Sequence, residues 1–322
     1  MGVIYLNHDD IGNISPCVAT IGFFDGVHLG HRFLIGQVIK EARSMGVLSM
    51  VITFDRHPRE VLHQDYQPEL LTTLPSKLQL LENTGVDQVV VLHFDEAMAQ
   101  LSAKQFMNQM LRNRLQVKKL IMGYDNRFGH NRAEVFDDYV RYGRELGIAV
   151  THHSAFEMNG IELSSSVVRA FLKEGEVELA NRCLGYPYTI KGRVVDGFKE
   201  GRRMGYPTAN LDMSGSGQLV PANGVYAVRV GIGDCRKTLP AMTCIGLRPT
   251  FGGTERTLET FIVNFHDDLY GQQLRLSFVK YIREERKFDN ITQLVNQLKE
   301  DERVIERIFN TNGGNFLTEE SK

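Results

Sequence analysis

The hydrophobic pattern of the chain changes near residue 184, and this change constrains the fold more than any other feature of the sequence. Between residues 18 and 183, short apolar runs rich in β-formers alternate with segments of helical periodicity. That alternation is typical of an α/β layer with a parallel sheet. After residue 184, apolar and polar residues alternate instead, as in the run 226–232, which indicates antiparallel β-structure. A length of 322 residues leaves room for about two domains of these kinds.

The first part, residues 1–183, is predicted to be a doubly wound α/β domain with five strands and crossing helices. Its apolar runs are short and continuous, as expected for parallel strands covered on both faces. Helices are predicted after Ser102, which lies at capping-box spacing from Gln105, and at 33–45, 135–146 and 167–172. The strands are predicted at 18–23, 48–54, 88–94, 120–123 and 148–153.

The second part, residues 184–310, is predicted to be a small closed antiparallel β-barrel followed by one long helix. Connections that contain Gly and Pro separate its strands, and closure of the barrel leaves no exposed sheet edge. The helix is predicted to begin after Asp289 or Asn290 and to pack an apolar stripe across the barrel. That stripe comprises Ile291, Leu294, Val295, Leu298, Ile305, Ile308 and Phe309. The polar residues 311–322 are predicted to form a disordered tail.

The composition narrows the range of functions. Its 37 basic and 39 acidic residues give a net charge of −2, without the positive excess of a protein that tracks nucleic acid. No apolar run of 18 residues and no signal-like N-terminus occur, so neither membrane contact nor secretion is expected. Four widely spaced cysteines fit free thiols in a reducing compartment. We therefore expect a cytoplasmic protein, monomeric or weakly homo-oligomeric, whose partners are small molecules.

The run 22–31, with the sequence Gly-Phe-Phe-Asp-Gly-Val-His-Leu-Gly-His, follows the first predicted strand. Its glycines permit a tight turn, and His28 and His31 lie three residues apart where the first helix is expected to begin. A helix N-terminus offers unpaired N–H groups and a positive dipole end, which favour a phosphate. Both imidazoles could then reach one phosphoryl group. Two structural histidines and a zinc site are the alternatives, although no third zinc ligand lies at convincing local spacing.

A second polar group opens the predicted helix near residue 165. Ser164, Ser165 and Ser166 are followed about one turn later by Arg169. Three hydroxyls and a guanidinium can hold an anion such as pyrophosphate, whereas a simple helix cap is the alternative. Ligands of doubly wound sheets bind outside the carboxyl ends of the strands, so the two helix starts are expected to face one crevice.

A third group lies in residues 192–210 of the second part. Glycines at 197, 201 and 205 alternate with Lys199, Arg202 and Arg203, which could form a mobile cationic flap over phosphates. Thr208 and Asn210 lie two residues apart, hence on one face of a strand, and offer the oxygen ligands that suit Mg²⁺. No GxxxxGK[ST] sequence occurs, which excludes a P-loop kinase. A solvated turn punctuated by a proline is the alternative.

Taken in order, the motifs of the first part resemble those of bacterial FAD synthetases. The run 22–31 is similar to their form of the nucleotidyltransferase HxGH element, G-x-F-D-G-V-H-x-G-H. The run 164–169 resembles their S-S-[ST]-x-x-R element, and 53–58 and 123–129 are similar to two further segments. In the last of these, Asn126 stands where the family usually has an aromatic residue.

The second part resembles the riboflavin kinase domain that bacterial FAD synthetases carry after the first. Pro207-Thr208-Ala209-Asn210 matches the P-T-A-N signature, and 244–251 and 258–260 match the I-G-x-R-P-T-F and L-E-[TS] segments. The runs 268–271 and 283–288 continue the likeness, which thus extends over about residues 17–309.

This resemblance implies a bifunctional enzyme that uses ATP and Mg²⁺. The C-terminal domain, expected to be a six-stranded barrel, would phosphorylate riboflavin to FMN. The N-terminal domain would adenylylate FMN to FAD and release pyrophosphate. The alternatives are a riboflavin kinase with weakened or lost adenylyltransferase activity, a non-catalytic flavin-binding regulator, and a class I aminoacyl-tRNA synthetase, which shares the HxGH logic.

The same resemblance assigns roles to individual residues. Glu259 is the expected base for the terminal ribityl hydroxyl, while His28, His31 and Arg169 are expected to act in adenylyl transfer. Thr208 and Asn210 are the expected Mg²⁺ ligands. The residues expected to bind nucleotide or flavin are Gly22, Phe23, Phe24, Asp25, Gly30, Phe54, His57, Asp125, Arg127, Ser164, Ser165, Gly192, Gly205, Pro207 and Arg283.

Overall fold

The computed structural model describes residues 2–6, 14–62, 65, 67–124, 126–154, 156–158, 160–197, 205–250 and 253–311. The chain divides into two compact units, Met1–Ser165 and Ser166–Lys322. This division falls before the helices at 165–184, which the sequence groups with the first domain, so the domain limits of 1–183 and 184–310 remain predictions. The tail at 312–322 lies outside the described residues.

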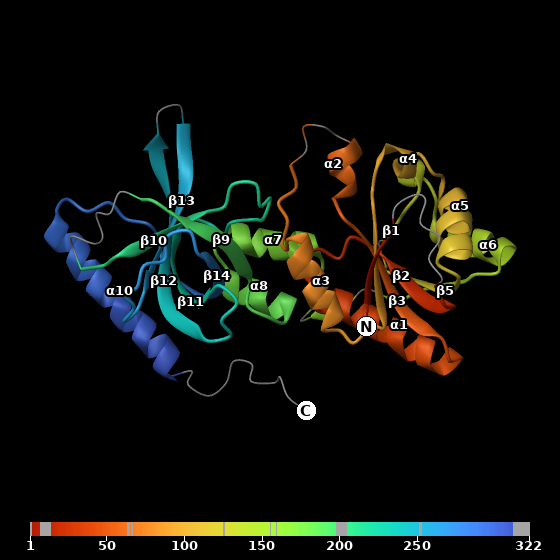
Figure 1. Ribbon diagram of the computed structural model, residues 1–322, viewed down its shortest axis with the longest axis horizontal. Helices are drawn as coiled ribbons and strands as arrows, with labels where there is room; N and C mark the ends of the chain where they lie inside the picture. The colour runs from red at the N-terminus through yellow and green to blue at the C-terminus, as the bar shows by residue number, and fades with distance from the viewer. Residues whose placement is uncertain are drawn as a thin grey trace. The chain divides into compact units, whose positions relative to one another are not determined.

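The first unit is built on a six-stranded sheet with the order β1-β4-β3-β2-β5-β6 (Figure 1). Every neighbouring pair in this sheet is parallel. The predicted doubly wound α/β class is thus confirmed. The strands are β1 (Gly2–Leu6), β2 (Cys17–Ile21), β3 (Leu48–Phe54), β4 (Gln88–Leu92), β5 (Val117–Met122) and β6 (Ala149–His152).

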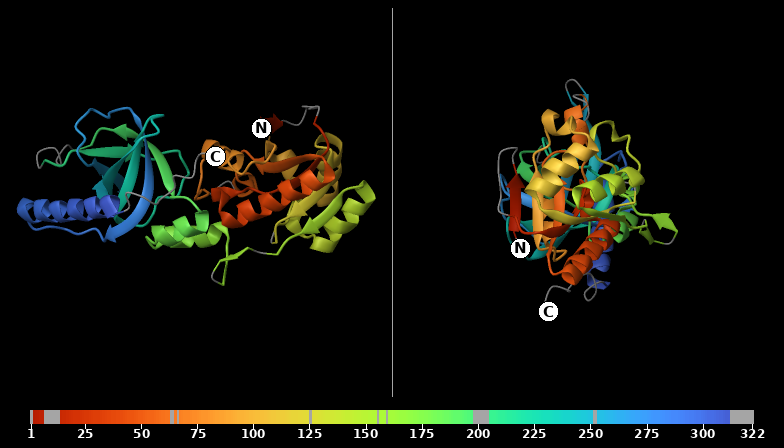
Figure 2. Two further views of the ribbon diagram at one scale, coloured as in Figure 1. Left: turned by 90° about the horizontal axis from the view of Figure 1, so that it is seen from below. Right: turned by 90° about the vertical axis from the view of Figure 1, so that its right-hand side faces the viewer.

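Helices cover both faces of this sheet (Figure 2). On one face, α1 (Leu29–Met45) and α3 (Leu74–Glu82) pack apolar side chains onto the strands. On the other face lie α5 (Ala103–Phe106), a π-helical stretch (Met107–Arg114) and α6 (Phe136–Leu146). The remaining elements of the unit are α2 (Pro58–Leu62), α4 (Glu96–Ala99), 3₁₀ turns at Asp25–Val27 and His130–Arg132, and a hairpin of β7 (Glu157–Met158) and β8 (Ile161–Glu162).

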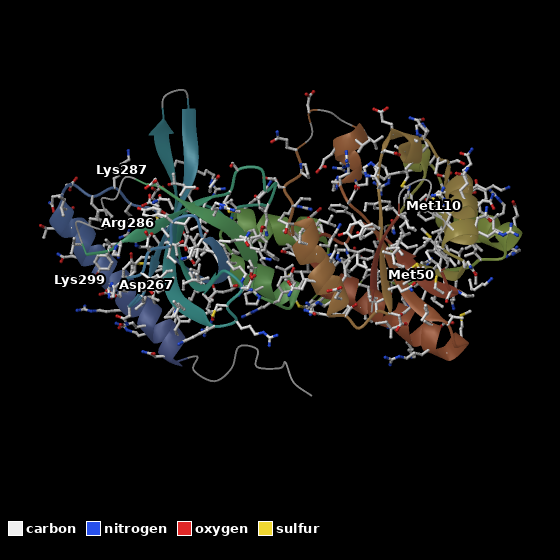
Figure 3. The ribbon with its side chains drawn as sticks, viewed as in Figure 1. Met50, Met110, Asp267, Arg286, Lys287 and Lys299 are labelled. Atoms are coloured by element: carbon white, nitrogen blue, oxygen red, sulfur yellow. The ribbon has the colours of Figure 1, made fainter. Side chains whose placement is uncertain are left out.

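The strands are buried on both sides because successive residues enter different cores. In β2, Val18 belongs to the core under α1, whereas Ala19 belongs to the core on the opposite face. Met50 and Met110 fill the second of these cores (Figure 3). Continuous apolar runs are the sequence pattern that such two-sided burial requires.

Three features of the first unit differ from the sequence expectations. β1 was not predicted, and it pairs with β4 at the sheet edge. The first helix begins at Leu29 and not at residue 33, because the His28 side chain caps it. After the confirmed capping box of Ser102 and Gln105, the helix widens into π-turns, where the N–H of Leu115 bonds the carbonyl of Met110 at 2.9 Å.

The second unit contains a closed antiparallel barrel with the strand order β10-β13-β12-β11-β14-β9, as predicted. Two helices, α7 (Ser165–Lys173) and α8 (Val177–Leu184), precede it. Its strands are β9 (Thr189–Val195), β10 (Thr208–Asp212), β11 (Gly224–Ile232), β12 (Thr238–Thr250), β13 (Gly253–Ile262) and β14 (Gln273–Arg283).

The long helix α10 (Ile291–Thr311) packs against the barrel. Asn290 caps it by accepting the N–H of Gln293 at 2.9 Å, which decides between the two predicted caps. Ile305 is fully buried among barrel side chains. Ile291 is an exception to the predicted stripe: it is 68% exposed, because it lies in the first turn beyond the packed part of the helix.

Candidate active sites

The first candidate site lies where β2 ends and α1 begins. The Nδ1 atom of His28 accepts the main-chain N–H of His31 at 3.3 Å, so a neutral His28 carries its proton on Nε2. The two imidazole rings stack with centroids 3.6 Å apart. The sequence prediction that both histidines act at one point is consistent with this stacking.

His31 is held in its neutral form. Its ring Nδ1 is buried without a hydrogen-bond partner among the described residues. Burial lowers the pKa of His31 well below its usual value, and the charges of His28 and Lys77 lower it further. At neutral pH this imidazole is therefore an N–H donor without a net charge.

Gly30 makes room for this histidine pair. A Cβ atom at Gly30 would lie 3.1 Å from Nδ1 of His28 and 3.5 Å from the carbonyl oxygen of Leu163. The loop before it is also unusual, because Phe24 and Val27 have positive φ angles of 54° and 37°. Such conformations cost energy in residues that have a Cβ and often mark functional sites.

Asp25 anchors this loop from within the protein. It is 3% exposed, and its carboxylate accepts the N–H groups of Leu71 and Thr72 at 2.9–3.0 Å. The Thr72 hydroxyl also accepts the N–H of Gly26 at 3.1 Å. We expected Asp25 to bind nucleotide or flavin, whereas these bonds favour a role in holding the loop.

Ser165 connects the second sequence motif to the same loop. Its hydroxyl donates to the main-chain oxygen of Asp25 at 2.9 Å. The 22–31 and 164–165 segments therefore meet, as expected from the strand order of a doubly wound sheet. Ser164 is partly buried beside it, and Arg169 belongs to α7 in the second unit.

Three aromatic residues predicted to bind nucleotide or flavin occupy different environments. Phe54 is 8% exposed and packs edge-on against Phe94 in the core, which favours a structural role. Phe24 is 3% exposed and contacts the edge of His31 at 5.1 Å. Phe23 is partly buried and meets His57 edge-on, with ring centroids 4.8 Å apart, so the run 22–31 contacts the segment after β3 here.

Sequence reasoning missed Lys77, which lies beneath this loop. Lys77 is 2% exposed and donates hydrogen bonds to the main-chain oxygens of Phe23 and Phe54 at 3.1 and 3.0 Å. A single lysine in an amphipathic helix gives no sequence signal, because most such lysines are exposed.

The 123–129 segment also contacts the site through Asn126. Its side-chain amide donates to the main-chain oxygen of Ile21, the last residue of β2. A phenylalanine has no donor for this bond, so Asn126 ties its segment to the end of β2 in a way that a phenyl ring could not. Arg127 is exposed, while Asp125 lies outside the described residues.

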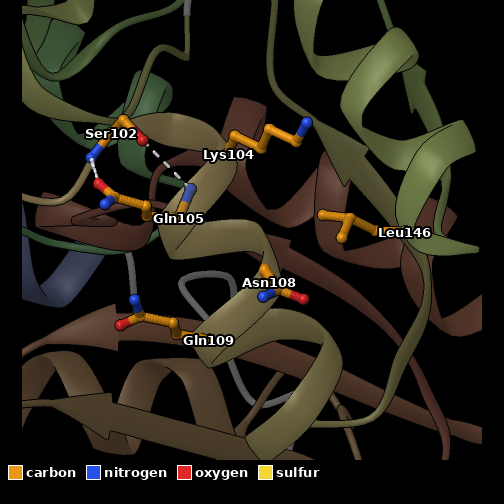
Figure 4. A pocket seen from close by; sticks show the side chains of 6 residues that line it. All are labelled: Ser102, Lys104, Gln105, Asn108, Gln109 and Leu146. Carbon is orange, nitrogen blue, oxygen red and sulfur yellow. Dashed lines mark hydrogen bonds between the residues drawn. The ribbon is translucent and has the colours of Figure 1, made fainter.

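A pocket of about 390 Å³ lies elsewhere in the first unit (Figure 4). None of the predicted site residues lines it. Lys104 is the ionisable residue in its wall, and this lysine pairs with Glu145 at 2.6 Å. The pocket thus offers no chemistry related to the motifs. It is lined by Ser102, Lys104, Gln105, Asn108, Gln109 and Leu146.

The second candidate site is formed by two neighbouring barrel strands. In the antiparallel register of β10 and β13, Asn210 lies directly opposite Glu259. Thr208 is two residues from Asn210, so the three side chains share one face of the sheet. The Thr208 hydroxyl donates to Glu259 Oε2 at 3.4 Å. The structure thus brings together the three polar residues that the sequence singled out in this half.

Two glycines allow close packing around β10. A Cβ atom at Gly197 would collide with the Asn210 side-chain amide. A Cβ atom at Gly192 would lie 2.9 Å from the main-chain oxygen of Asp212. Gly205 has a φ of 81° and precedes Tyr206 and Pro207, which lead into β10. The predicted cationic flap at residues 198–204 lies outside the described residues.

Arg283, which the sequence places at the flavin, has a structural partner on α10, and its contact with the flavin stays a prediction. Its guanidinium donates to both oxygens of the Asp301 carboxylate, at 2.7–3.2 Å. Asp301 lies on α10 and is 1% exposed. This ion pair joins β14 to α10, which favours a stabilising role for Arg283.

Comparison with known proteins agrees with this pair of sites. A family model for FAD synthetase matches residues 11–167, and a model for riboflavin kinase matches residues 184–309. The Escherichia coli (strain K12) bifunctional riboflavin kinase/FMN adenylyltransferase is 39% identical over 294 residues, which cover 91% of this chain and 93% of the relative. The chain belongs to this bifunctional family.

Further relatives extend over the same length. The Bacillus subtilis (strain 168) bifunctional riboflavin kinase/FMN adenylyltransferase is 35% identical over 304 residues, covering 92% of this chain and 93% of its own. Among solved structures, a Streptococcus pneumoniae protein named macrolide-efflux protein superposes with a TM-score of 0.85 and 32% identity, covering 94% of this chain and 98% of that one. Along the chain, the FAD synthetase match covers the unit with the His28 and His31 pair, and the riboflavin kinase match covers the barrel with Thr208, Asn210 and Glu259.

In the described parts of the chain, no helix combines the length and the apolar character needed to cross a bilayer.

Proposed function

We propose that this chain carries out both reactions of its family, each in its own unit. In the barrel, riboflavin and ATP give FMN and ADP. In the first unit, FMN and a second ATP give FAD and pyrophosphate. The observation that supports the proposal is that the chain forms two separate polar clusters, the stacked pair of His28 and His31 and the Thr208, Asn210 and Glu259 face.

Adenylyl transfer follows from the geometry of the histidine pair. A phosphate oxygen of FMN, already anionic near neutral pH, attacks the α-phosphorus of ATP while the bond to the β-phosphate oxygen breaks. Because Nδ1 of His28 accepts a main-chain N–H, its Nε2–H is the donor available to the α-phosphoryl oxygens. Neutral His31 supplies a second donor beside it. Preorganised donors of this kind stabilise the charge that grows in the transition state.

Pyrophosphate departs toward the start of α7. The Ser165 hydroxyl is committed to the Asp25 carbonyl, so Ser165 contributes its main-chain N–H in the first turn of the helix. Ser164 offers a further hydroxyl beside it, while the part of Arg169 stays an expectation from the sequence. This modifies the expectation that the Ser165 hydroxyl itself holds the leaving group.

Phosphoryl transfer takes place at the barrel face. Glu259 accepts the proton of the terminal ribityl hydroxyl, whose oxygen attacks the γ-phosphorus of ATP as ADP leaves. The oxygens of Thr208 and Asn210, spaced along one strand, suit a Mg²⁺ ion, and the absence of a Cβ at residue 197 permits the Asn210 amide its observed position. When bound there, Mg²⁺ offsets the charge of the transferring phosphates.

One experiment tests the whole proposal. The purified chain is incubated with Mg-ATP and riboflavin, or with Mg-ATP and FMN, and the three flavins are separated by chromatography. Formation of FMN and FAD from riboflavin, and of FAD from FMN, is expected. A chain that forms FMN but no FAD is a riboflavin kinase that has lost the second activity. A chain that binds flavin without converting it is a regulator.

A further inference from the structure

Lys77 carries a buried ammonium group next to the run 22–31 in the first unit. The adenylyl-transfer steps proposed above assign it no role. Its ammonium donates to the carbonyls of Phe23 and Phe54 and lies 3.9 Å from the centroid of the Phe23 ring. The first carbonyl belongs to the run 22–31, and the second ends β3. A lysine that is 2% exposed is costly unless its charge is paired or used.

The Lys77 charge is surrounded by groups from several elements. Asp25 approaches it from the 3₁₀ turn and Asp55 from the segment after β3, while His31 faces it from α1. Asp55 is itself bonded to His93 at 2.6 Å. Burial lowers the pKa of Lys77 to about 8, although the two carboxylates raise it.

The Phe23 carbonyl is also fixed by a second donor. The hydroxyl of Thr53 bonds it at 3.1 Å, so β3 and α3 hold one carbonyl together. Five residues further along the chain, His28 caps α1. A change at the Phe23 carbonyl would therefore move the peptide segment that sets the orientation of the His28 ring.

We propose that Lys77 is a positioning residue for adenylyl transfer, which ties the Phe23 and Phe54 carbonyls into one frame and sets a positive charge beside His31. The inference rests on the proposed function of this site. Lys77 touches no reactant, because its side chain is covered by protein. It acts by fixing the loop that carries His28 and by disfavouring the protonated form of His31.

The substitution Lys77→Met tests this role, because methionine keeps much of the volume without the charge or the donors. FMN adenylylation should fall roughly 10²-fold in kcat with little change in the KM for ATP, as for a misplaced catalytic group. Riboflavin phosphorylation in the same sample should stay unchanged. Leu78→Ala is the matched control, since Leu78 is the neighbouring buried residue on α3 and bears no charge.

The second readout is the titration of His31, followed by NMR of its ring Cε1–H and assigned with His31→Gln. Lys77→Met should raise the pKa of His31, while Leu78→Ala should leave it unchanged. The proposal is supported only if adenylylation falls and the pKa rises in Lys77→Met alone. An unchanged rate or an unchanged pKa in folded Lys77→Met overturns it, and so do equal effects in Leu78→Ala.

The unmodified chain provides a test that does not depend on the folding of a variant. As pH rises through about 8, Lys77 loses its proton, so the ratio of FMN adenylylation to riboflavin phosphorylation should fall. Both reactions use Mg-ATP, so the ratio removes effects on that substrate. A ratio that stays flat across this pH overturns the proposal for Lys77. Absence of any FAD would instead overturn the proposed function.

Discussion

The Nδ1 atom of His28 accepts the main-chain N–H of His31 at 3.3 Å, so one histidine both caps α1 and aims its Nε2–H away from the helix. In the proposed adenylyl transfer, capping and catalysis therefore depend on the same ring. This double use explains why the helix starts at Leu29, directly after the histidine, and not at the later point that periodicity alone predicts.

His28→Ala should abolish most FAD formation and leave FMN formation intact. Loss of one preorganised donor costs roughly 10² to 10³ in rate. His28→Asn is the matched variant, because asparagine caps helices well but lacks the imidazole donor. Both variants should lose adenylylation, and the asparagine variant should be the more stable. Chromatographic flavin assays measure this outcome. Loss of both activities in a folded variant would contradict two separate sites.

Gly30→Ala should reduce adenylylation by displacing the His28 ring. A Cβ atom there would lie 3.1 Å from Nδ1 and 3.2 Å from Cε1 of His28. Gly36→Ala is the control on the same helix, since no atom lies within 4 Å of a Cβ at that position. That control should keep full activity and gain about 0.5–1 kcal/mol in the free energy of unfolding. Equal FAD formation by both variants would show that the close contact has no effect.

Glu259→Gln and Asn210→Ala should block riboflavin phosphorylation and still convert supplied FMN to FAD. The two side chains lie opposite each other in the β10–β13 register. Each substitution therefore removes a different functional group from the same face of the sheet. Glu259→Gln removes the proton acceptor, whereas Asn210→Ala removes an oxygen ligand and should raise the Mg²⁺ concentration needed for any residual activity. Normal turnover of riboflavin in both variants would exclude this face as the kinase site.

The sequence predicted the layers of the fold well because they depend on local patterns. Two-sided burial produced the continuous apolar runs of β2 and β3. In β11 the alternation reflects residue size more than exposure, because seven of its nine residues are buried. The sequence did not predict β1, because its five residues form a strand by pairing with β4, which is more than 80 residues away in the chain.

The sequence predicted the motifs of the site but not the hydrogen bonds that hold the site loops in place. His28, Glu259 and Asn210 were found because their residue types and spacing fit phosphate chemistry and a known family. The support comes from contacts to main-chain atoms, such as Lys77 to the Phe54 carbonyl and Thr72 to Gly26. These bonds are made to a main-chain carbonyl at Phe54 and to a main-chain N–H at Gly26, groups that do not depend on the side chain there, so they leave no pattern in the sequence.

Arg283→Ala should destabilise the packing of α10 on the barrel. It would leave the Asp301 carboxylate, 1% exposed, without its guanidinium partner, which costs about 3–5 kcal/mol for a buried pair. The double variant Arg283→Met/Asp301→Leu removes both charges and should recover most of this loss. Arg303→Ala, which breaks an exposed pair with Glu300 on the same helix, should cost at most about 1 kcal/mol.

Urea unfolding followed by circular dichroism measures these three changes. Arg283→Ala should show the largest loss in the free energy of unfolding, and Arg303→Ala the smallest. A loss in Arg283→Ala no greater than that in Arg303→Ala would show that the buried pair does not hold α10. The arginine would then again be a candidate for contact with the flavin.

His31 should make the stability of the first unit fall in mild acid. The folded-state pKa of His31 is lowered by burial first, then by His28 and Lys77, whereas the unfolded chain takes up a proton near pH 6.5. Below that pH the unfolded state therefore binds more protons than the folded state, and the free energy of unfolding decreases as pH falls. Above that pH the ring is neutral in both the folded and the unfolded state, so the contribution of His31 to the free energy of unfolding is constant.

His31→Gln isolates this contribution from those of the other histidines. The free energy of unfolding, measured from above pH 6.5 down into mild acid, should fall more steeply for the unmodified chain than for the variant. The difference in slope has an upper limit of about 1.4 kcal/mol per pH unit, the value for one proton. His31→Gln should also lose FAD formation at every pH, because glutamine lacks the stacked imidazole. Parallel stability curves for the two proteins would mean that the folded state binds this proton as readily as the unfolded chain, so that folding does not lower the pKa of His31.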